Sequence, residues 1–261
     1  MIDRTIIYME PDIDELFWDE DDCGIGDSET ICHDSGFELK LNINGLSEWL
    51  SKYVNEILIP CSTGQISLKD LRKNYDWISF LKEGIRLAYE VRKILPDNID
   101  LVFNTPWEYQ LHDIPQSFMV PQKEKISKIS YLTEDVSVSE AGNPNVNYKG
   151  VFYVIDGRKL EYKGYNPLDK NDICETDDLI DCQSLEDDDN ETPAVLLNHC
   201  KCGLWLCNSM IAQVIYEGDK VRWRIHRYAR DIIFQEFLFD RAEYEQTMNS
   251  IFSEAKQQAG G

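Results

Sequence analysis

Three cysteines and one histidine lie within nine residues of one another in the segment NHCKCGLWLC, which begins at Asn198. Cys200, Cys202, Cys207 and His199 offer thiolate and imidazole groups, the ligands that zinc prefers in a tetrahedral structural site. A glycine follows the second cysteine and would let the backbone curl around an ion. One hypothesis is therefore a closed zinc site at these four residues, which would stabilise the local fold without performing chemistry.

The sequence leaves two other interpretations of this cluster open. The gap between Cys200 and Cys202 is one residue, whereas paired zinc ligands usually have a longer spacing. Further candidates for the fourth ligand are His226, Cys174 and Cys182. In a strand, Cys200 and Cys202 would point the same way and fill the core as small apolar groups. A reactive thiol at Cys202 or Cys207 would make a cysteine-dependent enzyme, but it would need a base placed nearby. The expected cofactor is thus none or one structural zinc.

Acidic residues are concentrated in two segments of the chain. Of the net charge of −22, residues 1–36 carry −11 and residues 172–191 carry −10, which leaves −1 for all other residues. Binding to a nucleic-acid backbone requires clustered lysine and arginine, so no nucleic-acid partner is expected. The acidic segments are either solvated loops or a surface for a basic protein partner.

Two large apolar residues, Phe17 and Trp18, lie among the carboxylates of the first acidic segment. They either anchor this segment onto the core or contact a partner. The residues predicted to contact a partner are Phe17, Trp18, Asp19, Glu20, Asp21, Asp22, Glu186, Asp187, Asp188 and Asp189.

The basic and aromatic run KVRWRIHRYAR, residues 220–230, could be taken for a nucleic-acid surface. Its alternation instead favours a strand in which Val221, Trp223 and Ile225 face the core and the arginines pair with the acidic loops.

The first 120 residues predict an α+β half. Residues 37–43 alternate like a strand, and residues 46–58 have the apolar spacing of an amphipathic helix. Residues 67–95 predict a long helix that begins with a capping box and ends at Pro96, followed by a strand at 98–104. We expect these N-terminal helices to pack on a small sheet.

Residues 121–261 predict antiparallel hairpins closed by a final helix. Asp156-Gly157 and Glu217-Gly218-Asp219 lie between apolar runs and indicate tight hairpin turns. Asp240 and Glu243 are spaced like an N-cap and its capping-box partner. The predicted fold class is α+β, with a soft boundary near residue 120, although both halves could form one domain.

Neither a membrane span nor an export signal is expected, because the chain has no long apolar run and its first residues carry an acidic flank. Without export, the eight cysteines are expected to be buried thiols or metal ligands rather than disulfides. A cytoplasmic protein without a membrane partner is predicted.

The last 100 or so residues resemble a group of uncharacterised bacterial proteins with a shared C-terminal pattern. The pattern is an apolar strand, then C-x-C-G-x-x-x-C, then a V-x-W strand, then F-D-R-x-x-Y-E opening a helix. The matching residues here are Val195, Leu196, Leu197, Cys200, Cys202, Gly203, Cys207, Val221, Trp223, Phe239, Asp240, Arg241, Tyr244 and Glu245. The resemblance implies no activity, and the acidic insertion at 172–191 is longer than the group's pattern leads us to expect.

Small, acidic and diverse cytoplasmic proteins of this kind are similar to immunity proteins of bacterial toxin systems, by analogy alone. The leading hypothesis from the sequence is therefore a protein-binding protein that neutralises a basic partner such as a toxin. The alternatives are a structural zinc-binding module and a cysteine-dependent enzyme.

Overall fold

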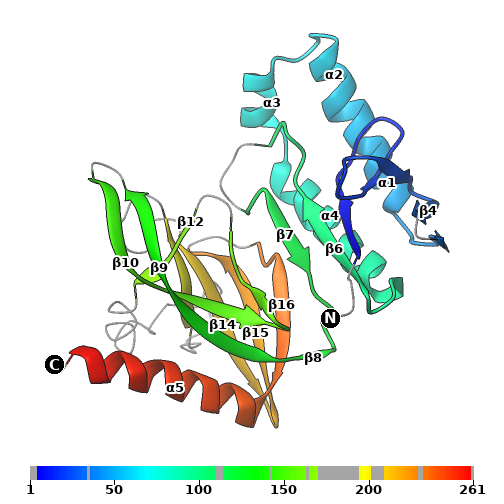
Figure 1. The fold of residues 1–261 in the computed structure, drawn as a ribbon. Helices are drawn as coiled ribbons and strands as arrows, with labels where there is room; N and C mark the ends of the chain where they lie inside the picture. The colour runs from blue at the N-terminus through cyan, green and yellow to red at the C-terminus, as the bar shows by residue number, and fades with distance from the viewer. Residues whose placement is uncertain are drawn as a thin grey trace. The chain divides into compact units, whose positions relative to one another are not determined.

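The computed structural model describes residues 5–33, 36–109, 114–140, 143–162, 165–169, 194–200, 209–228 and 232–259. The protein has a mixed α+β structure (Figure 1) and divides into two compact units, Met1–Gln122 and Lys123–Gly261. Within the described ranges, no helix is both long and apolar enough to cross a membrane.

Unit 1 contains a seven-stranded sheet in the order β5-β4-β3-β2-β1-β6-β7. Its strands are β1 (Thr5–Met9), β2 (Phe17–Trp18), β3 (Gly24–Gly26), β4 (Thr30–His33), β5 (Phe37–Lys40), β6 (Ile99–Asn104) and β7 (Ser117–Val120). The central pair, β1 and β6, is parallel, with Met9 opposite Phe103 at its carboxyl end. The other described pairs of this sheet are antiparallel. The loops that follow β1 and β6 therefore leave the sheet at the same edge.

The helices of unit 1 lie between β5 and β6 in the chain. They are α1 (Leu46–Tyr53), the π-helical turn η1 (Val54–Leu58), α2 (Ile59–Ser62), α3 (Leu68–Asn74) and α4 (Trp77–Ile94). Ser67 caps α3 as predicted, with its hydroxyl oxygen accepting from the Asp70 amide at 3.1 Å. The single long helix predicted over 67–95 is wrong. Tyr75 is extended and Asp76 caps a new helix by accepting from the Ser79 amide at 3.1 Å, so the chain turns between α3 and α4.

An aromatic cluster fixes α1 and α4 against β6. The ring of Trp49 stacks on Phe80 at 4.8 Å and lies 6.2 Å from Phe103, measured between centroids. Gly84 of α4 makes this approach feasible, because a Cβ atom there would lie 2.5 Å from the Trp49 ring. Close packing of this kind holds the carboxyl end of β6 in a defined place.

Unit 2 contains a nine-stranded sheet in the order β11-β10-β12-β13-β14-β15-β16-β8, with β9 paired to β10. Its elements are β8 (Ile126–Ser127), β9 (Ile129–Glu140), β10 (Asn143–Ile155), β11 (Arg158–Lys159), β12 (Tyr165–Asp169), β13 (Ala194–Cys200), β14 (Met210–Glu217), β15 (Lys220–Arg227), β16 (Gln235–Asp240) and α5 (Arg241–Ala259). All described pairs are antiparallel except β16 with β8.

Both predicted hairpin turns of this unit are present. Ile155 pairs with Arg158 across Asp156-Gly157, whose positive φ angles of 51° and 82° suit a tight turn. Glu217 pairs with Lys220 around Gly218, which has φ 66°. Turn chemistry is local, so the sequence was sufficient to place these two reversals.

The final helix packs on the sheet of unit 2 through β9, β15 and β16, as Figure 1 shows. Asp240 caps α5 as predicted, since its carboxylate accepts from the Glu243 amide at 3.0 Å. Trp223 of β15 is fully buried and lies edge-on to Phe239 and Tyr244, with centroid distances of 5.2 Å and 5.9 Å. This tryptophan is the centre of the core of unit 2.

Candidate functional site

The first acidic segment lies along strands β1 to β4. Its described part, residues 5–33, contains ten Asp and Glu residues and no Lys or Arg. Asp19 organises the turn at its centre, because one carboxylate oxygen accepts from the amides of Asp21 and Cys23, both at 2.9 Å. Glu20, Asp21 and Asp22 are exposed, and within the described residues they form no ion pair. Four of the predicted contact residues thus gather in one turn.

Phe17 and Trp18 have different roles in this segment. Phe17 is fully buried and anchors the segment onto the core, so it offers no surface to a partner. Trp18 is half-buried, and its indole nitrogen donates to the carbonyl oxygen of Glu10 at 3.0 Å. Trp18 therefore connects the acidic turn to the loop that follows β1.

The loops after β1 and β6 meet at the carboxyl edge of the parallel pair. The amide of Asn104, the last residue of β6, donates to the carboxylate of Glu10 at 2.8 Å. Glu10 comes directly after β1, so this bond joins the two strand ends. Crevices at the carboxyl ends of parallel strands are common binding positions in sheets that contain them.

Glu108, in the loop after β6, carries a buried carboxyl group. Its side chain has no exposed surface, and the hydroxyl of Tyr53 donates to its two oxygens at 3.3 Å and 3.2 Å. Burial raises the pKa of the Glu108 carboxyl, and the negative charges of Asp12 and Glu10 raise it further. Hydrogen bonds from the backbone amide of Glu108 and from the Tyr53 hydroxyl oppose this shift in pKa. Burial, followed by the charge of Glu108, likewise raises the pKa of Tyr53. Two carboxylates of the loop after β1 therefore interact with one buried acid of the loop after β6.

Replacement of Glu108 with glutamine is expected to flatten the pH dependence of stability. Because the folded state binds the Glu108 proton more tightly than the unfolded chain does, the unfolding free energy falls as pH rises from about 4.3 through the raised folded pKa. Glu108→Gln keeps an acceptor for Tyr53 but has no proton to lose, so it should be more stable than wild type at pH 7. Urea unfolding between pH 3 and pH 8 measures this. The control Asp14→Asn changes an exposed carboxylate and should keep the wild-type dependence of the unfolding free energy on pH. If Glu108→Gln also kept the wild-type dependence, Glu108 would not be the group whose raised pKa lowers the stability.

Two large apolar side chains project from the same two loops. Ile13 and Trp107 are each 58% exposed. The loop that carries Ile13 is closed by a hydrogen bond from the Glu10 amide to the Leu16 carbonyl at 3.0 Å. The turn that carries Trp107 is closed by a bond from the Tyr109 amide to the Pro106 carbonyl at 2.9 Å. Both side chains are therefore presented on hydrogen-bonded loops.

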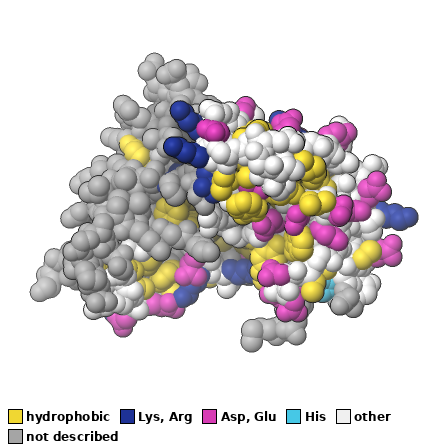
Figure 2. All heavy atoms as spheres, turned by 90° about the horizontal axis from the view of Figure 1, so that it is seen from above, with side chains coloured by type: hydrophobic (Ala, Val, Ile, Leu, Met, Phe, Trp, Pro, Cys, Tyr) yellow, Lys and Arg dark blue, Asp and Glu magenta, His cyan; other side chains and the backbone are white. Residues whose placement is uncertain are grey.

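We call Glu10, Asp12, Ile13, Asp14 and Trp107 the acidic-aromatic edge. Asp12 and Asp14 are exposed and form no ion pair within the described residues. Figure 2 shows a face of the protein on which acidic side chains lie among apolar ones. The sequence reasoning missed Trp107. Two features of the sequence could have identified Trp107 as a candidate surface residue. It directly follows Pro106, and it lies shortly after the predicted strand at 98–104, outside every segment with helical or strand periodicity.

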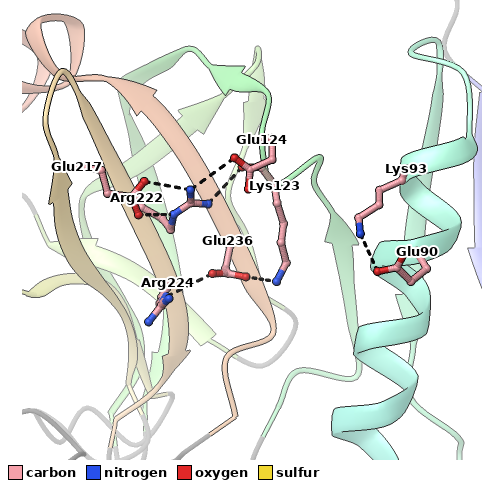
Figure 3. A network of polar contacts seen from close by, with 8 residues as sticks. All are labelled: Glu90, Lys93, Lys123, Glu124, Glu217, Arg222, Arg224 and Glu236. Carbon is pink, nitrogen blue, oxygen red and sulfur yellow. Dashed lines mark hydrogen bonds and ion pairs between the residues drawn. The ribbon is translucent and has the colours of Figure 1, made fainter.

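The arginines of β15 do not form a free cationic surface. Val221, Trp223 and Ile225 face the core as predicted, each with no exposed surface. Arg222 pairs with Glu217 at 2.7 Å and with Glu124 at 3.7 Å (Figure 3).

Arg224 pairs with Glu236 at 3.3 Å, and Glu236 also pairs with Lys123. In the described part of the chain these partners belong to unit 2 itself, not to the acidic segments that the sequence suggested. The positive charge of Arg222 and Arg224 is thus neutralised by carboxylates of the same unit.

The predicted metal ligands fall largely outside the described residues. Cys202 and Cys207 lie outside them, as do Glu186, Asp187, Asp188 and Asp189 of the second acidic segment. For Cys200 only the backbone is described, at the end of β13, while His199 is described next to it. Among the side chains that are described, no group of three or more His, Cys, Asp or Glu could hold a metal ion.

Comparisons with protein-family models, with curated proteins and with solved structures found no match to this chain.

Proposed function

We propose that this protein is a binding protein that captures a basic protein partner through the acidic-aromatic edge. The observation that carries the proposal is the exposure of Trp107 and Ile13, each 58%, next to carboxylates without cationic partners. The scaffold is a two-part α+β fold, with N-terminal helices on a small sheet and C-terminal hairpins closed by a final helix.

Charge and aromatic surface would contribute different parts of the binding. Unpaired carboxylates accelerate encounter with a cationic partner and disfavour acidic ones. Tryptophan is among the residues most often found to dominate binding energy, because its large surface is desolvated on contact. Loops already closed by hydrogen bonds lose little conformational entropy on binding. The edge thus combines the features of a site for a protein with a basic surface.

The partner in this proposal is a bacterial toxin that the protein neutralises in the cytoplasm. Support for this step is the excess of negative charge, −22 in total, and the analogy with acidic immunity proteins. In this view Asp19, Glu20, Asp21 and Asp22 extend the contact, and Glu186, Asp187, Asp188 and Asp189 add to it.

Site-specific photocrosslinking in cells tests this function. The full chain would carry a photoreactive phenylalanine analogue at Ile13, with a matched control at Ile94, which is 43% exposed on α4. We expect the Ile13 bait to crosslink a basic polypeptide that the Ile94 bait does not. The purified partner should bind more weakly as salt increases and should inhibit growth unless this protein is co-expressed. Equal crosslinking at both positions, or an acidic partner, would refute the proposal.

We also propose, from the sequence, that His199, Cys200, Cys202 and Cys207 hold one structural zinc ion. Protein purified without a chelator or a metal-affinity tag should contain about one zinc per chain, and chelation should release about three additional reactive thiols. Elemental analysis and thiol titration measure both quantities. Metal-free protein whose thiols react slowly would instead indicate cysteines buried in the core. Metal-free protein with a rapidly labelled thiol would favour the cysteine-dependent enzyme.

A further inference from the structure

Unpaired polar atoms gather at one end of the sheet in unit 2. Eight buried side-chain polar atoms in the described residues have no hydrogen-bond partner, and five of them belong to Asn166, Asn198, Ser209 and Arg227. These residues lie on or beside β12, β13, β14 and β15. Buried polar groups are nearly always satisfied, so a local concentration of exceptions needs a physical explanation.

The strand register places Asn198 and Arg227 on the same face of the sheet, in one row that runs across β13, β14 and β15. Asn198 is opposite Met210, and Met210 is opposite Arg227. Directly opposed residues point to the same side of a sheet. Asn198 and Arg227 are therefore separated only by the buried side chain of Met210.

The side chain of Arg227 extends along this row toward β12. Its guanidinium carbon lies 5.7 Å from the ring centre of Tyr165, which belongs to β12, three strands away from β15. To reach that ring the guanidinium must pass over Met210 toward β13, where Asn198 lies. Arg227 is only 3% exposed, yet its Nε and Nη1 atoms have no acceptor among the described residues.

Whereas Arg227 has unpaired donors, Asn198 has an unpaired acceptor. Its side chain is 4% exposed, and its Nδ2 atom donates weakly to the Asn166 carbonyl at 3.4 Å. Its Oδ1 atom has no donor. The row therefore offers two unpaired donors on a cation and one unpaired acceptor on an amide.

We propose that Arg227, Asn198 and Tyr165 form a binding site for a small anion that also carries a hydroxyl group. The anionic oxygen would accept from the guanidinium, the hydroxyl would donate to Asn198 Oδ1, and the Tyr165 ring would flank the cation. A 2-hydroxy carboxylate and a protonated phosphate both supply this chemistry. Such a site is separate from the acidic-aromatic edge and does not depend on its function.

Isothermal titration calorimetry of the full chain at constant ionic strength tests the site with three probes: lactate, propionate and inorganic phosphate. Lactate or phosphate should bind saturably, and propionate, which lacks the hydroxyl, should bind about tenfold more weakly than lactate. Arg227→Gln should weaken binding of every bound probe by about 10- to 100-fold. Arg224→Gln is the matched control, because Arg224 lies on the same strand but is only half-buried and is paired with Glu236, and this variant should bind like wild type.

If Arg227→Gln does not fold, Asn198→Leu keeps the proposal testable. This variant removes the acceptor and should abolish the difference between lactate and propionate. No binding of any probe to wild type, or equal binding by Arg227→Gln and Arg224→Gln, would overturn the proposal. A preference for lactate alone assigns the ligand to hydroxy carboxylates, and a preference for phosphate assigns it to phosphates.

Discussion

Trp223→Ala is expected to destabilise the protein by about 3–5 kcal/mol, the range measured when a fully buried large aromatic side chain is truncated. Trp223 has no exposed surface, and its ring lies edge-on to Tyr153, Phe239 and Tyr244 at 5.3 Å, 5.2 Å and 5.9 Å. Truncation removes contacts to β10, β16 and α5 at once, so the cavity cannot be closed by moving one element. Urea unfolding monitored by circular dichroism measures the loss.

The matched control for this prediction is Trp107→Ala, the same chemical change at a side chain that is 58% exposed. It should alter the unfolding free energy by no more than about 0.5 kcal/mol, as is usual for surface substitutions. A loss below about 1 kcal/mol in Trp223→Ala would mean that the ring is not the centre of the core.

Features that depend on a few neighbouring residues could be predicted from the sequence. The turn at Asp156-Gly157 and the caps at Ser67 and Asp240 each require only residues up to three positions apart. The alternation around Trp223 also identified the buried face of β15, since strand periodicity is local.

Pairing between distant segments could not be predicted in the same way. The parallel contact of β1 with β6 joins residues more than ninety positions apart, for example Met9 with Phe103. Sequence periodicity can indicate a strand, as it did at 98–104, but it does not indicate the partner of that strand. Likewise the break at Tyr75 and Asp76 was missed because the apolar residues of α3 and α4 continue the same helical period.

The same limit explains which parts of the candidate site were missed. The sequence predicts Phe17 and Trp18 as contact residues because they lie beside carboxylates in the chain, yet Phe17 is a core residue. Trp107 has one acidic neighbour in sequence, Glu108, and that carboxyl is buried. The exposed acids near it come from the loop after β1, which only the sheet topology brings to the same edge.

Trp107→Ala is expected to weaken binding of the crosslinked partner by about 30- to 1,000-fold while leaving the fold intact. Truncation of a central tryptophan in an interface commonly costs about 2–4 kcal/mol of binding free energy. The turn around Trp107 is held by the bond from Tyr109 to Pro106 and by the packing of Tyr109 on Trp77 at 5.5 Å, so it should persist without the indole ring. Calorimetry with the purified partner measures the change in Kd.

Two variants separate the contribution of Trp107 from general effects on the surface. Trp107→Phe should recover part of the affinity, because an aromatic ring can still be desolvated on contact. Ile94→Ala removes an exposed apolar side chain from α4 and should leave Kd unchanged. Binding that depends steeply on salt but is unaffected by Trp107→Ala would assign recognition to charge alone, and the acidic-aromatic edge would then not be the interface.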